Sequence, residues 1–181
     1  MSAPTKQEPF RLGFLTAIEV PEKGYVGGLL VTTHHGRPLE FQCTLPVKAN
    51  PTQEILYGPT LGPFILGELI GGALVDKAGI KPHLVLTDQE QILELRAHVT
   101  SPVAFVQADS SEPGKKRIQA VAATGELRLG RQMLRFHAAH AEDVEKISVE
   151  SARFPDDADL SEPFVRVREA LQEALKVGGL R

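Results

Sequence analysis

The order of strand-like and helix-like segments constrains the fold of this chain more than any single motif in it. Three strand-like runs come first, at residues 11–20, 25–33 and 38–47. The segments that follow are a helix in two parts (51–57 and 63–78), a strand (83–87), a helix (89–99) and a strand (102–107). This order predicts an α+β fold, in which a mixed β-sheet begins with a three-strand antiparallel unit and is flanked by helices.

The three N-terminal strands differ in the faces that they are expected to bury. Residues 11–20 carry apolar side chains on both faces, which is typical of a central strand. The next two runs are separated by a short turn and should form an antiparallel hairpin. In the third run, Leu39, Phe41, Cys43 and Leu45 alternate with polar residues, so we expect these four side chains to face the core.

The helix after the third strand has a clear start and a clear interruption. Asn50 can cap it, and Gln53 can complete a capping box. Pro59 and Pro63 each remove a backbone donor and clash with the preceding turn. The helix must therefore break between its two parts.

The second part of this helix raises the question of a membrane span. Residues 58–75 are largely apolar, but they include Glu68, two prolines and five glycines, whereas a span needs roughly 20 mostly apolar residues. Gly67 and Gly71 lie four apart and would let another backbone approach closely. A buried core helix is therefore predicted, with no membrane contact.

The rest of the chain is expected to belong to the same unit. Residues 1–9 read as a disordered tail and residues 10–181 as a single α/β domain, of which 141–181 form a C-terminal helical segment. Residues 117–123 read as a strand, whereas 127–137 fit either a strand or a helix. A hydrophobic content of 42% suits a globular chain.

Charge and cysteine content limit the classes of protein to consider. The net charge is −3 at pH 7, so there is no overall attraction to nucleic acid or to an anionic membrane. The single cysteine cannot form an intramolecular disulfide. The N-terminus is polar and lacks the apolar core of a signal peptide, so a cytoplasmic location is expected.

Three carboxylates stand at joints between predicted elements. Glu19 closes the first strand, Glu54 lies at the start of the first helix, and Asp88 follows the fourth strand. Mg²⁺ and Mn²⁺ prefer oxygen ligands, so acids that converge from three elements could hold such an ion. Each acid also has an adequate structural role, as a strand-end charge, a helix N-terminal charge and an N-cap respectively. The structural roles are the favoured interpretation.

The element order, together with acids at these joints, resembles the ribonuclease-H-like fold over residues 11–107. The hairpin run GYVGGLLV and the strand end LVLTD are similar in character to that family's pattern. The resemblance implies that Glu19, Glu54 and Asp88 would hold divalent metal for phosphodiester hydrolysis, with a fourth acid at 142 or 143. The chain departs from the family in using glutamate rather than aspartate as the first acid and in interrupting the first helix with prolines. A cytidine-deaminase-like arrangement has a similar element order, but its zinc signature is absent.

The remaining reactive side chains form no specific motif. Cys43 lies on an apolar stripe and is interpreted as an inert buried thiol. The two adjacent histidines at 34–35 should diverge if the backbone there is extended. We interpret all six histidines as solvated turn and helix-end residues rather than as a zinc site. The six are His34, His35, His83, His98, His137 and His140.

Charge is unevenly distributed in the C-terminal third. Six basic residues form a strip that could contact phosphate: Lys115, Lys116, Arg117, Arg128, Arg131 and Arg135. Residues 142–162 carry an excess of acids, so the strip could instead be neutralised by this segment. Neutralisation within the chain or across a dimer is the favoured interpretation.

Two functions remain open at this point. The favoured one is a non-catalytic cytoplasmic module without a cofactor, which uses apolar and amphipathic helix surfaces to bind a protein partner or a second copy of itself. Its interaction residues are expected on the C-terminal helix at Phe164, Val167, Leu171 and Leu175. The alternative is a ribonuclease-H-like nuclease that uses the three acids with Mg²⁺ or Mn²⁺; only this alternative includes nucleic acid as a partner.

Overall fold

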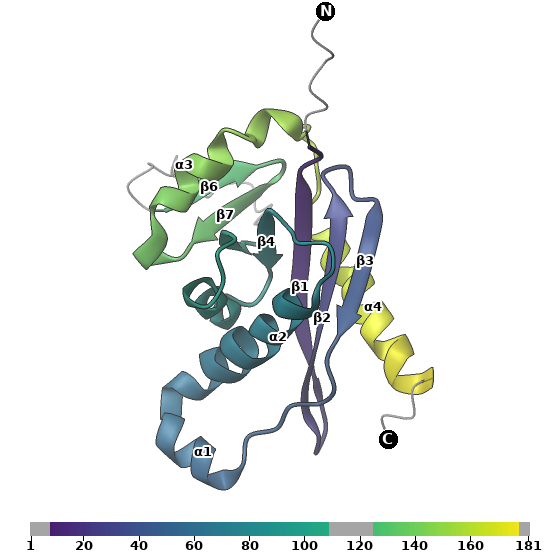
Figure 1. The fold of residues 1–181 in the computed structure, drawn as a ribbon, viewed down its shortest axis with the longest axis vertical. Helices are drawn as coiled ribbons and strands as arrows, with labels where there is room; N and C mark the ends of the chain where they lie inside the picture. The colour runs from purple at the N-terminus through teal and green to yellow at the C-terminus, as the bar shows by residue number, and fades with distance from the viewer. Residues whose placement is uncertain (1–7, 109–124, 178–181) are drawn as a thin grey trace, which may run out of the picture.

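The computed structural model describes residues 8–108 and 125–177 and contains one mixed sheet (Figure 1). Its strands are β1 (Arg11–Val20), β2 (Gly24–Thr33), β3 (Pro38–Cys43), β4 (Leu84–Thr87), β5 (Val103–Val106), β6 (Glu126–Leu129) and β7 (Gln132–Phe136). They lie in the order β3-β2-β1-β4-β5-β7-β6. The first three strands pair antiparallel, and β4 and β5 extend the sheet in parallel to β1. The fold is therefore α+β with ribonuclease-H-like order, which confirms the predicted fold class.

Helical segments cover both faces of this sheet. The longer segments are α1 (Pro51–Tyr57), the π-helix η2 (Pro63–Gly71), α2 (Gly72–Lys77), the 3-10 helix η3 (Glu90–Ala97), α3 (Glu142–Ser148) and α4 (Glu162–Val177). Short 3-10 turns occupy Gly58–Thr60, Ala138–His140 and Ser151–Arg153. Figure 1 shows α4 on one side of the N-terminal strands and α2, with the helix leading to it, on the other.

The central position of β1 follows from its apolar residues on both faces. Leu12 and Phe14 belong to the core beneath α4, and Phe14 meets the ring of Phe164 edge-on at 5.4 Å. Leu15 and Ala17 belong to the second core, beneath η2 and η3. The predicted central strand is thus confirmed with its predicted bounds.

The buried face of β3 was predicted wrongly. The strand ends at Cys43, and Leu39, Phe41 and Cys43 are exposed, as is Leu45 beyond it. The reason is that α4 packs against β1 and β2 but does not extend over this edge strand. Glu40, on the other face, instead accepts hydrogen bonds from the backbone amides of Gly79 and Ile80.

The predicted capping box begins α1. The Asn50 side chain accepts from the Gln53 amide at 2.8 Å, and the Gln53 side chain accepts from the Asn50 amide at 3.1 Å. The predicted break is also present, because the helical stretches 51–60 and 63–77 meet at 101°. Within the described part of the chain, no single helix has both the length and the apolar character needed to cross a membrane. The two helical stretches together have the required length and apolar composition, but they are bent against each other.

Close packing between η2 and η3 depends on glycine. A Cβ at Gly67 would lie 3.0 Å from Glu94 Cβ, and one at Gly71 would lie 3.2 Å from the Leu95 side chain. The predicted close approach at these two glycines is therefore confirmed, and η3 is the partner. Ile65, Leu66 and Ile70 on η2 are buried, as expected of a core helix.

Three expectations for the later segments have different outcomes. Residues 127–137 are resolved as the hairpin β6–β7, whereas the predicted strand 117–123 lies outside the described residues. Asp88 is not a helix cap, because Gln89 occupies the cap position of η3. The apolar stripe of α4 is not a partner surface: Phe164, Val167 and Leu171 are buried against the chain's own sheet, and Leu175 is partly buried there.

Candidate functional site

Two of the three predicted acids meet at one cavity. Glu19, near the end of β1, and Glu54, on α1, both line a pocket of about 320 Å³ that opens beside the β1–β2 turn. Leu61 and Ile65 provide its apolar lining, and Lys48 lies at the same pocket. The two glutamates are far apart in sequence, so their approach is a consequence of the fold.

The chain leading to α1 explains how Glu54 reaches β1. Tyr25 and Val47 exchange two backbone hydrogen bonds of 2.8 Å, which bring the segment after β3 back across the start of β2. Gly24 permits this approach, because its φ is +95° and a Cβ there would lie 2.1 Å from the Val47 carbonyl oxygen. The capping box then starts α1 directly beyond this crossing.

The electrostatics of this pocket are those of a carboxylate site. Glu22 joins Glu19 and Glu54 in its lining, and all three side chains belong to exposed residues. Lys48 is held nearby by a 3.1 Å hydrogen bond from its Nζ to the Glu22 carbonyl. The pocket therefore combines carboxylate oxygens with one cation at its rim.

Asp88 does not join this pocket. Its Oδ1 accepts a 2.8 Å hydrogen bond from Thr16 Oγ1, and its Oδ2 forms an ion pair with Arg168 on α4. Asp88 thus faces the α4 side of the sheet, whereas the Glu19–Glu54 pocket is lined by Leu61 and Ile65 from the opposite layer. The structure separates the three predicted ligands onto two faces.

The described residues fit a divalent ion only in part. Among residues 8–108 and 125–177, no three His, Cys, Asp or Glu side chains are grouped closely enough to hold a metal ion. Asp88 is already neutralised by Arg168. Glu19 and Glu54 are suitable in kind, because Mg²⁺ is often held by one or two carboxylates together with substrate phosphate and water.

The fourth predicted acid has a structural role elsewhere. Asp143 is fully buried and accepts from Arg96 Nε at 2.6 Å and from Arg96 Nη2 at 3.3 Å. This pair links η3 to α3, so Asp143 does not contribute to the carboxylate pocket. Its neighbour Glu142 is exposed and lies 3.3 Å from His140.

The basic strip is only partly within the described residues, because Lys115, Lys116 and Arg117 lie outside them. Arg135 forms an ion pair with Glu90 and lies over the Phe105 ring at 5.2 Å. The β6–β7 turn docks on the acidic segment through the Arg131 amide, which donates to the Ala158 carbonyl at 3.0 Å. That contact joins uncharged backbone groups, so neutralisation of the strip by residues 142–162 stays a prediction.

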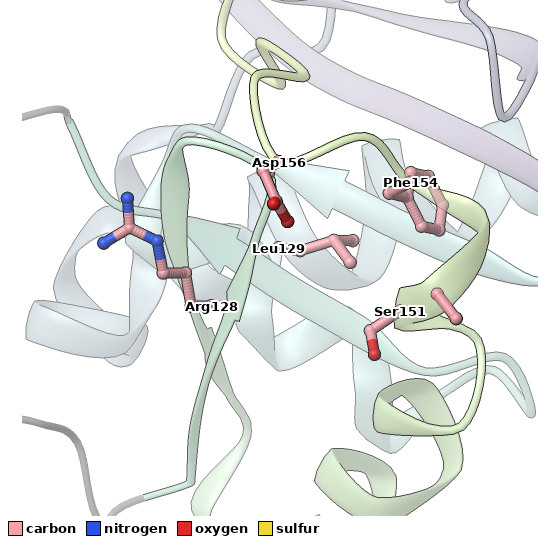
Figure 2. A pocket seen from close by; sticks show the side chains of 7 residues that line it. Arg128, Leu129, Ser151, Phe154 and Asp156 are labelled. Carbon is pink, nitrogen blue, oxygen red and sulfur yellow. The ribbon is translucent and has the colours of Figure 1, made fainter.

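Arg128 lies at a separate polar pocket of about 430 Å³ with Asp156 and Ser151 (Figure 2). Its guanidinium extends away from Ser151 and Phe154, whereas Asp156 lies between Arg128 and these two residues. The contact of Arg128 with phosphate stays a prediction.

The histidines are more engaged than the sequence suggested. His34 and His35 do not diverge, since their ring centroids lie 3.9 Å apart, and burial followed by the charge of His35 lowers the pKa of His34. His83 accepts from the Arg11 amide at 2.9 Å, and burial lowers its pKa. The other three lie beside glutamates: His98 at Glu68, His137 at Glu94 and His140 at Glu142.

Sequence reasoning missed one further cavity. Tyr57 and Phe64 stack with centroids 4.2 Å apart and line a pocket of about 320 Å³ with Glu68 and Glu94. The two prolines that break the helix could have indicated it, because a bend there brings the aromatic rings on either side together.

The strand order and the helices on both faces define an α+β fold with ribonuclease-H-like element order. Neither a protein-family model nor a curated protein matches the chain. Among solved structures, human ENDOV is similar at a TM-score of 0.43 with 13% identity, covering 95% of this chain and 88% of that one. The catalytic domain of human endonuclease V has a TM-score of 0.43 and 16% identity, covering 96% and 86%. Ciona intestinalis endonuclease V, in complex with DNA containing an inosine followed by a ribo-adenosine, has a TM-score of 0.43 and 13% identity, covering 92% of this chain and 87% of that one.

The burial of the α4 stripe corrects the favoured functional prediction. The expected non-catalytic module relied on the apolar stripe of α4, but that stripe is buried within the chain. The prediction of an assembly module that docks through this stripe, with a protein partner or a second copy, is therefore wrong.

Proposed function

We propose that this protein is a metal-dependent phosphodiester hydrolase that acts on nucleic acid. The observation that carries this proposal is the meeting of Glu19 and Glu54 at one pocket beside the end of β1. Both side chains offer hard oxygen donors that would suit a divalent ion, and the pocket is open to a substrate phosphate. The fold is of a kind that hosts many functions, so the proposal depends on this site and not on the fold alone.

Three residues of the pocket have defined roles in the proposal. Glu19 and Glu54 would hold the ion from two elements whose relative position is set by the Tyr25–Val47 pairing. Lys48, fixed by its hydrogen bond to the Glu22 carbonyl, attracts the phosphate backbone. When bound, a divalent ion supplies charge neutralisation at the phosphate and a more acidic water. Asp88 takes no part, because Arg168 neutralises it on the other face of the sheet.

A cleavage assay tests this proposal. End-labelled single- and double-stranded DNA and RNA, each with and without inosine, are incubated with the protein and Mg²⁺ or Mn²⁺. We expect cleavage that EDTA abolishes and that Glu19→Gln and Glu54→Gln each reduce by about a hundredfold or more, since each removes one charged ligand.

The control is Glu169→Gln, which changes an exposed glutamate on α4 away from the pocket lining. This variant should cleave as the unmodified protein does, and all three variants should keep its melting temperature. Absence of cleavage on every substrate, or full activity in both pocket variants, would refute the proposal.

A further inference from the structure

Each oxygen of the Asp88 carboxylate has a donor from a different layer of the molecule. Thr16 Oγ1, on β1, donates to Oδ1 at 2.8 Å, and the Arg168 guanidinium, on α4, pairs with Oδ2. The side chains of Asp88 and Arg168 are only 21% and 39% exposed. The charge of the carboxylate is therefore balanced from within the chain.

The position of Asp88 is set by the residues around it. Thr16 is fully buried, so its hydroxyl cannot turn away to bond solvent. Gln89, the next residue, accepts from the Ala17 amide at 2.8 Å and donates to the Ala17 carbonyl at 3.1 Å. The backbone that carries Asp88 is thus tied to β1 directly beyond the β1–β4 pairing.

The position of Arg168 is set from the other side. Val167, directly before it, and Leu171 are residues of α4 that are fully buried against the sheet. They sit closely over Gly28 of β2, where a Cβ would lie 2.9 Å from Val167 and 3.0 Å from Leu171. The helix therefore presents the guanidinium to Asp88 without any rearrangement.

We infer that the Arg168 guanidinium neutralises the Asp88 carboxylate, so that Asp88 does not bind divalent metal. The same ion pair anchors α4 to the β1–β4 edge of the sheet. A metal ion at this carboxylate would have to displace the guanidinium and would then lie beside an uncompensated positive charge. This inference departs from the metal-ligand role that the ribonuclease-H-like resemblance implied for Asp88. It does not depend on the proposed hydrolysis.

Calorimetric titration with Mn²⁺ tests whether Asp88 contributes to metal binding. The dissociation constant should be the same, within threefold, for the unmodified protein and for Asp88→Asn. A loss of affinity of tenfold or more in Asp88→Asn would overturn the inference. If the unmodified protein binds no Mn²⁺ at all, the inference stands and the proposed hydrolase fails.

Hydrogen exchange tests the anchoring role independently of metal. Asp88→Asn and Arg168→Gln should each speed exchange of the α4 amides by about fivefold, the effect of losing one partly exposed ion pair. The double variant should exchange no faster than either single one, because both changes remove the same contact.

Arg166→Gln is the matched control on the same helix. Arg166 pairs with Glu162 and donates to the Gly36 carbonyl, so it does not share the Asp88 contact. Its effect should add to that of Asp88→Asn. Additive effects of Asp88→Asn and Arg168→Gln, or unchanged α4 exchange in both, would overturn the inference.

Discussion

Gly24 illustrates how a single residue positions the carboxylate pocket. Its φ of +95° lies in the region that favours glycine, and the Val47 carbonyl occupies the space of a side chain. The crossing that carries Glu54 toward Glu19 depends on both features.

We expect Gly24→Ala to lower the free energy of unfolding by about 2 kcal/mol or more, from backbone strain and the clash with Val47. Chemical denaturation measures this value. Gly72→Ala is the control, because Gly72 is helical and a Cβ there would meet nothing within 4 Å. That variant should be neutral or stabilised by up to about 1 kcal/mol. Equal stability of the two variants would contradict the prediction.

The Arg96–Asp143 pair is the clearest case of a buried charge in the described residues. Asp143→Asn should lower the free energy of unfolding by about 3 kcal/mol, because Arg96 would remain buried without its counter-charge. Glu150→Gln, which breaks the more exposed pair with Arg153, should cost no more than about 1 kcal/mol. Urea melts of both variants give the comparison, and a cost for Asp143→Asn below that of Glu150→Gln would rule the interpretation out.

At the scale of elements, β3 and α4 differ from what their periodicity predicted. The apolar face of β3 was expected in the core, and the apolar stripe of α4 was expected to face a partner. The apolar side chains of β3 are exposed at the sheet edge, and those of α4 form part of the core. A leucine of α4 and a leucine just beyond the end of β3 therefore make a direct comparison.

Leu171→Ala should lower the free energy of unfolding by about 2–5 kcal/mol, because Leu171 is fully buried and its loss leaves a cavity. Leu45→Ala should change it by less than about 0.5 kcal/mol, since Leu45 is 72% exposed. Thermal and chemical denaturation measure both values. A large cost for Leu45→Ala would show that the edge of the sheet is covered in solution.

For the whole molecule, two partly buried histidines make stability depend on pH. Burial lowers the pKa of both His34 and His83 below 6.5, so the unfolded chain binds protons more readily than the folded chain does. Stability should consequently rise with pH up to about 6.5 and fall as pH drops below it. The pKa of Glu40 is also lowered, chiefly by its hydrogen bond with Gln42. Protonation of Glu40 should therefore reduce stability further, but only below about pH 4.5.

Melting temperatures at pH 5 and pH 7.5 test this dependence. The protein should melt at a lower temperature at pH 5, and the difference should be smaller in His83→Gln. His140→Gln is the control, because His140 lies beside Glu142 on another element, away from His34 and His83. A melting temperature that is equal or higher at pH 5 would contradict the expectation.

Much of the fold could be predicted because the signals are local. Proline geometry breaks the helix between 57 and 63, the Asn50 capping box starts α1, and two-sided apolar character makes β1 central. These features follow from steric and hydrogen-bonding rules that act over a few residues. The order of the elements then leaves few ways of arranging one mixed sheet.

The candidate site was decided by the tertiary structure. The sequence predicted Glu19, Glu54 and Asp88 as site residues. The fold brings only Glu19 and Glu54 to one pocket, whereas Asp88 forms an ion pair with Arg168. Likewise, alternation in β3 defined two faces but not which one a helix would cover. The physical reason is that ion pairs and buried faces depend on contacts between residues distant in the chain, whereas turns, caps and breaks depend on neighbours.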